Sequence, residues 1–126
     1  EGGIISESTG DVYECTVVFL DGFPMQYIIL KNGLEIGKAD GVQNVAFSVV
    51  QNDNTIYSNT ENTDPYCLFG GNGPCNYWVF EDYVYKWGAG GPVLETGVYI
   101  LKIAPNLDDP SINLFWSADV TMTVPK

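Results

Sequence analysis

Hydrophobic and polar residues alternate through most of this chain, which is the pattern of strands that bury one face of a sheet. In residues 43–51 the alternation places Val45, Phe47 and Val49 on the buried face. Further strands are expected at residues 12–20, 25–31, 34–38, 55–59, 77–87 and 97–104, and residues 112–124 are expected to form one or two more. No stretch keeps an apolar period of 3.6 residues, so the sequence predicts no substantial helix.

Turn-forming residues separate these strands at short intervals, among them Asp21-Gly22 and Asn32-Gly33. The second is the clearest, because Asn-Gly takes the positive φ angles of a two-residue type I′ hairpin at low cost. Seven to nine short strands indicate an antiparallel β-sandwich of immunoglobulin-like or jelly-roll topology, and we expect the immunoglobulin-like one. Residues 1–10 are expected to be a flexible N-terminal arm, loose or paired with a sheet edge, and residues 11–126 a single domain.

Charge narrows the functions open to this domain. The chain has sixteen acidic residues, five lysines and neither arginine nor histidine, for a net charge of −11. Nucleic acid is gripped by clustered lysine and arginine, so we expect no nucleic acid partner. No apolar run approaches the roughly 20 residues that span a bilayer, so membrane insertion is not expected either.

The same composition removes most catalytic chemistry. Without histidine there is no Ser-His-Asp or Cys-His relay, and without arginine there is no bidentate clamp for a phosphate or carboxylate. Glu81 and Asp82 are neighbours in an expected strand, where adjacent side chains point to opposite faces and cannot flank one bond. We therefore predict no catalytic residues and no enzyme activity.

The cysteines indicate the compartment. Cys67 and Cys75 are separated by a span rich in glycine and proline, which can bring two sulfur atoms together, so we predict a disulfide. Free thiols or a metal site are the alternatives, but the only other thiol is Cys15. A disulfide indicates an oxidising compartment, and we expect a secreted, extracellular protein. Cys15 itself is expected to be a buried apolar side chain, with a link to another chain as the alternative.

Aromatic residues gather in residues 77–87. Five of them are candidate contacts for a ligand or partner: Tyr77, Trp78, Tyr83, Tyr85 and Trp87. If the strand is unbroken, the last three share a face. An exposed row of such rings could stack on sugar rings, pack a second copy of the protein or hold an elongated apolar ligand. Ordinary core packing is the competing interpretation.

Oxygen-rich loops raise the question of a metal. Asp53, Asp64, Asp108 and Asp109 are candidate ligands for a weakly bound calcium ion, because calcium takes six to eight oxygens from such loops. None of the loops has the spacing of an EF-hand, and turns use the same residues for local hydrogen bonds. We expect no other cofactor.

Residues 43–104 carry a series of less common motifs. The first is the strand with Val45, Phe47 and Val49. It is followed by the segment Thr60-Glu61-Asn62-Thr63-Asp64-Pro65-Tyr66-Cys67-Leu68-Phe69-Gly70-Gly71-Asn72-Gly73. After this segment come the aromatic residues Tyr77 and Trp87 and then the strand Gly97-Val98-Tyr99-Ile100-Leu101. This series resembles immunoglobulin-like modules in large extracellular proteins of bacteria and protists, which sit beside malectin-like or cadherin-like domains. The resemblance implies an extracellular, adhesive or sugar-associated role. Gly71 stands where those modules have an acidic residue, and the two cysteines are an addition.

Together these observations predict a non-catalytic extracellular structural or adhesive binding module. Its expected partners are other copies of itself or an extracellular protein or glycan. A lectin-like module that binds carbohydrate through an aromatic face is one alternative, and a carrier of a small apolar ligand or pigment is another.

Overall fold

The computed structural model describes residues 4–20, 23–71, 75–76, 78–88 and 90–123. In this part of the chain there are eleven strands and one 3-10 helix, η1 (Lys38–Asp40), so the predicted all-β fold is confirmed. A five-stranded sheet contains β1 (Ile4–Ile5), β2 (Val12–Leu20), β3 (Phe23–Lys31), β4 (Leu34–Ile36) and β7 (Tyr66–Cys67). A four-stranded sheet contains β5 (Val42–Gln51), β6 (Asn54–Glu61), β10 (Gly97–Leu107) and β11 (Trp116–Met122). A small hairpin contains β8 (Val79–Glu81) and β9 (Val84–Lys86).

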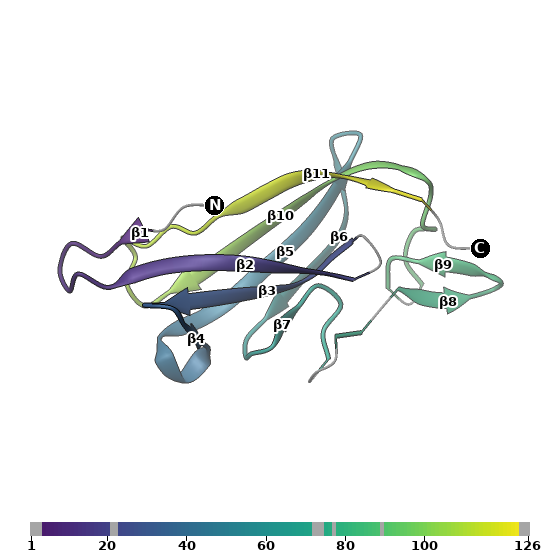
Figure 1. Cartoon of the computed structure of the whole chain (residues 1–126). Coiled ribbons are helices and arrows are strands. Elements are labelled where there is room, and N and C mark those ends of the chain that lie inside the picture. The colour runs from purple at the N-terminus through teal and green to yellow at the C-terminus, as the bar shows by residue number, and fades with distance from the viewer. Residues whose placement is uncertain (1–3, 21–22, 72–74, 77, 89, 124–126) are drawn as a thin grey trace.

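The two larger sheets form the layers of an antiparallel sandwich, with the β8–β9 hairpin at one end (Figure 1). In the first sheet β3 lies between β2 and β4 and also pairs with β7; in the second the order is β11-β10-β5-β6. The chain crosses between the sheets after β4, returns with β7 and crosses again to β10. This Greek-key order is the predicted immunoglobulin-like one.

The core follows from the alternation read in the sequence. Val45, Phe47 and Val49 are buried, as predicted, and join Tyr27 and Ile29 of the other sheet in one hydrophobic cluster. Each buried aliphatic or aromatic side chain contributes about 1.5–3 kcal/mol relative to an exposed one, so this cluster is the main source of stability.

Two tyrosine hydroxyls attach loops to the core. The Tyr99 hydroxyl donates to the Glu95 carbonyl oxygen at 2.6 Å and accepts from the Glu95 amide at 3.1 Å. This is the tyrosine corner of immunoglobulin-like sandwiches, in which a tyrosine near the start of a central strand bonds to backbone just upstream. The Tyr27 hydroxyl donates to the Leu114 carbonyl oxygen at 2.7 Å, which fixes the segment before β11.

Two-residue turns close three of the hairpins, at Asn32-Gly33, Asn52-Asp53 and Asp82-Tyr83. Asn32 and Gly33 have φ angles of 53° and 83° between β3 and β4, which confirms the predicted type I′ turn. Asp82 and Tyr83 have φ angles of 53° and 66°, and this turn splits the strand expected over residues 77–87 into β8 and β9. The condition of one unbroken strand is therefore not met, and the turn was not predicted because Asp-Tyr lacks the glycine that usually marks such a turn.

Other boundaries also differ from expectation. The strand count exceeds seven to nine because β1, β4, β7, β8 and β9 are only two or three residues long. Between the strands expected at residues 55–59 and 77–87, Tyr66 and Cys67 pair with β3 as β7. The Asp21-Gly22 turn lies outside the described residues. Ile4–Ile5 pair with β2, and the division into an arm and a domain stays a prediction.

Candidate interaction surface

The loop after β7 is held by the predicted disulfide. Cys67 and Cys75 are bonded, with their Cα atoms 5.4 Å apart. Gly70 has a φ of 79°, and its amide donates to the Cys67 carbonyl oxygen at 3.1 Å, which starts the turn between the cysteines. The Tyr57 hydroxyl and the Asn59 side-chain amide both donate to the Leu68 carbonyl oxygen at 3.1 Å, so β6 supports the same loop.

The two candidate tryptophans lie in the core. Trp87 is 2% exposed and Trp78 is 8% exposed. Their ring centroids are 6.2 Å apart in an edge-to-face arrangement, and Trp87 also packs on Phe69 at 5.9 Å and on Tyr99 at 5.2 Å. Buried indoles cannot form the exposed platform considered from the sequence, because the disulfide-held loop and the start of β10 cover them.

The other aromatic candidates lie on the β8–β9 hairpin, apart from Tyr77, which lies outside the described residues. Tyr83 is 93% exposed at the tip and Phe80 is 59% exposed, whereas Tyr85 is half-buried with its ring 4.9 Å from that of Phe80. The turn at residues 82–83 removes the face that Tyr83, Tyr85 and Trp87 would share on an unbroken strand.

The hairpin also brings Glu81 and Asp82 to one lysine, against the expectation that they point apart. The Lys86 ammonium lies 3.2 Å from an Asp82 oxygen and 3.6 Å from a Glu81 oxygen. The hydrogen bond to Asp82 is the main reason that the pKa of Lys86 is raised. These carboxylates are thus engaged in an ion-pair cluster at the turn.

The four candidate calcium ligands do not form one site. Asp53 lies in the β5–β6 turn, the Asp64 carboxylate accepts from the Lys38 amide at 3.2 Å, and Asp108 accepts from the Gln43 side chain at 3.0 Å. In the described ranges no group of three or more acidic, cysteine or histidine side chains is arranged to hold a metal. A calcium site stays a prediction.

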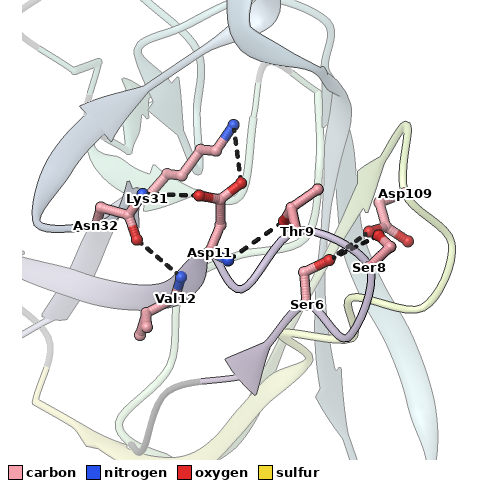
Figure 2. A network of polar contacts seen from close by, with 8 residues as sticks. All are labelled: Ser6, Ser8, Thr9, Asp11, Val12, Lys31, Asn32 and Asp109. Atoms are coloured by element: carbon pink, nitrogen blue, oxygen red, sulfur yellow. Dashed lines mark hydrogen bonds and ion pairs between the residues drawn. The ribbon is translucent and has the colours of Figure 1, made fainter.

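Asp109 belongs to a polar network that lies near the first residue of β2, Val12 (Figure 2). It accepts from the Ser111 hydroxyl at 2.7 Å and from the buried Ser6 hydroxyl at 3.3 Å. The Ser111 hydrogen bonds are the main reason that the pKa of Asp109 is lowered. Asp11 accepts from the Asn32 side chain at 2.9 Å and pairs with Lys31 at 3.6 Å.

A cleft of about 560 Å³ lies beside this network. It is lined by Ile4, Ile5, Glu7, Ser8, Asp109 and Ser111. Sequence reasoning singled out only Asp109 among them. The others were missed because the cleft forms between segments about a hundred residues apart, and only the tertiary fold brings these together.

The outer faces of the two sheets differ in charge. Directly opposed residues of antiparallel neighbours share a face, so the strand registers identify which side chains point outward. The outer face of the five-stranded sheet carries Glu14 and Glu35, which lie opposite Leu30 on either side, and no basic residue balances them among the described outward positions.

The outer face of the four-stranded sheet carries one charge of each sign, Lys102 and Asp119. Its positions are Asn44, Ala46, Ser48, Val50, Thr55, Ser58, Thr60, Val98, Ile100, Lys102, Ala104, Asn106, Ser117, Asp119 and Thr121. The face is therefore neutral in a chain of net charge −11, and sequence reasoning did not identify it.

The chain matches no family model, and no curated protein or solved structure is found to be similar to it. The resemblance to modules of large extracellular proteins therefore stays a prediction. The disulfide is compatible with an extracellular setting. Among the described residues the one helix is the three-residue η1, so none qualifies as a membrane-spanning helix.

Proposed function

We propose that this protein is a non-catalytic, secreted structural or adhesive module that works by associating with further copies of itself. The observation that carries this proposal is the neutral outer face of the four-stranded sheet on a strongly acidic protein. Two copies with a charge of −11 each repel one another, and the repulsion is weakest where their facing surfaces carry no net charge.

The absence of histidine and arginine, which removes the common nucleophilic relays and bidentate clamps, supports the non-catalytic part. The adjacent carboxylates Glu81 and Asp82 share the ammonium group of Lys86, which suits a structural role at the hairpin turn better than proton transfer.

Sedimentation velocity over a concentration series tests the proposal. We expect the mass to rise from 13.8 kDa towards a multiple of it, because association follows mass action. We also expect association to strengthen as salt rises from about 0.01 M to 0.15 M, where the Debye length falls from about 30 Å to 8 Å and the general repulsion is screened. A protein that stays at 13.8 kDa throughout both series would refute self-association.

A glycan is a second candidate partner, and the tip of the β8–β9 hairpin is the observation that favours it. Tyr83 is 93% exposed and adopts a φ of 66°, a conformation that costs an aromatic residue more than glycine or asparagine. An exposed ring at that position suits stacking on a sugar. Wild-type protein should then bind members of a glycan array and Tyr83→Ala should lose them, with Tyr83→Phe as the control that keeps the ring. Equal binding by Tyr83→Ala would exclude this role for the hairpin.

A further inference from the structure

The outer face of the four-stranded sheet has the features of a surface that pairs with its own copy. Ile100 lies at its centre, directly opposite Val50 on β5 and Asp119 on β11. Ile100 is 37% exposed and Val98 is 56% exposed, so apolar side chains are open to solvent here. Lys102 is the next outward residue of β10 after Ile100, which makes it a diagonal neighbour of Asp119.

The two charged side chains do not satisfy each other within the chain. Lys31 pairs with Asp11, and Lys86 pairs with Glu81 and Asp82, but no ion pair within the described residues involves Lys102 or Asp119. Both are exposed. Diagonal neighbours on adjacent strands have Cα atoms roughly 7–8 Å apart, so the two charges lie close enough together on one face to be met by a single partner surface above the sheet.

On the basis of the proposed function, we propose that two copies dock face to face through the outer face of the four-stranded sheet, on a two-fold axis that sets Lys102 of each copy against Asp119 of the other. A two-fold interface presents the same patch on both sides, so contacts occur in reciprocal pairs. An axis that lies in the interface plane and bisects the line from Lys102 to Asp119 exchanges the two positions. One basic and one acidic residue per face are then sufficient to form two ion pairs.

The charges on the two sheets favour docking through the four-stranded sheet over docking through the five-stranded sheet. Docking through the five-stranded sheet would bring Glu14 and Glu35 of one copy against the same residues of the other, and like charges in contact are unfavourable. On the four-stranded sheet, Ile100 and Val50 lie beside the charged pair and offer apolar contact, and the small Ser48 lies opposite Lys102. Burial of Ile100 and Val50 would exclude water from the ion pairs and strengthen them.

Charge reversal tests the arrangement through sedimentation velocity of the intact chain. Lys102→Glu changes the net charge from −11 to −13, and Asp119→Lys changes it from −11 to −9. We expect each variant alone to dimerise at least about tenfold more weakly than wild type, because each reversal creates two like-charge contacts in a symmetric dimer. An equimolar mixture of the two variants should recover dimers. In the mixed dimer the introduced glutamate faces the introduced lysine, and the native Asp119 of one copy faces the native Lys102 of the other.

Matched controls separate this pairing from a general effect of charge. Lys38→Glu also gives −13 and Glu14→Lys also gives −9, but these positions lie on η1 and on the other sheet. Both controls should dimerise within about threefold of wild type. Circular dichroism should show all four variants folded, because the substituted side chains are exposed.

Each outcome decides a different claim. Recovery in the mixture, with both single variants weakened, supports the proposed dimer. If wild type associates and the Lys102 and Asp119 variants associate equally well, or if the mixture remains monomeric, the two-fold pairing is wrong while self-association stands. If wild type is a monomer at every protein and salt concentration, both the two-fold pairing and the proposed function are wrong.

Discussion

Removing the Tyr99 hydroxyl should destabilise the protein by about 2 kcal/mol. Tyr99→Phe keeps the ring, which packs 5.2 Å from Trp87, but deletes two hydrogen bonds to the Glu95 backbone. Each such bond contributes about 1 kcal/mol, and the carbonyl and amide that remain are only partly able to reach water. For a domain of this size, 1 kcal/mol corresponds to about 4 °C, so Tm should fall by about 8 °C.

Urea unfolding followed by circular dichroism measures the change directly. The m-value should stay constant, since the substitution alters stability and not the surface exposed on unfolding. Tyr83→Phe is the matched control: it deletes a hydroxyl from a side chain that is 93% exposed, and should change the free energy of unfolding by less than about 0.5 kcal/mol. If Tyr99→Phe is as stable as that control, the tyrosine corner does not anchor the chain before β10.

Three further changes follow from the same structure. Trp87→Ala should cost about 3–5 kcal/mol in urea unfolding because the indole is 2% exposed, and a loss below about 1 kcal/mol would show that it is not a core residue. Gly33→Val should cost about 1–2 kcal/mol because the residue has a φ of 83°, whereas a Gly33→Val protein that melts like Gly33→Asn would contradict this strain. Burial, with the charges of Asp64 and Asp40, raises the pKa of Tyr66 to about 12. An unfolded tyrosine has a pKa of about 10. The contribution of Tyr66 to the free energy of unfolding is therefore fully present below pH 10 and is lost as pH rises from about 10 to 12. Tyr66→Phe should flatten that decline in the free energy of unfolding, and an unchanged slope would argue against it.

The alternation of apolar residues and the short sequence motifs correctly predicted the features that depend only on neighbouring residues in the chain. The buried face of β5 follows from a period of two, which any strand with one face in the core must show. The Asn32-Gly33 turn follows from backbone preference alone, and the disulfide from two cysteines joined by a flexible span. None of these requires knowledge of which strands are neighbours in space.

The remaining features either lack a local signal or depend on distant contacts. Asp82-Tyr83 adopts a turn without the usual glycine, so no local signal split the aromatic run. Core packing was one of the two interpretations of the aromatic run, and it holds for Trp78 because Phe69 and Trp87 pack against it, but the sequence alone does not show that the disulfide-held loop covers these rings. The neutral face is assembled from strands β5, β6, β10 and β11, whose outward residues can be read individually but whose adjacency comes from topology.

The most direct test of the account is a dilution series of two-dimensional amide NMR spectra on the wild-type chain. Resonances at the contact surface shift with concentration as dimers dissociate. We predict that the concentration-dependent shifts cluster on the outward positions of the four-stranded sheet, centred on Val50, Ile100 and Asp119. Shifts confined to the β8–β9 hairpin or the five-stranded sheet, at concentrations where the mass doubles, would contradict dimerisation through the four-stranded sheet.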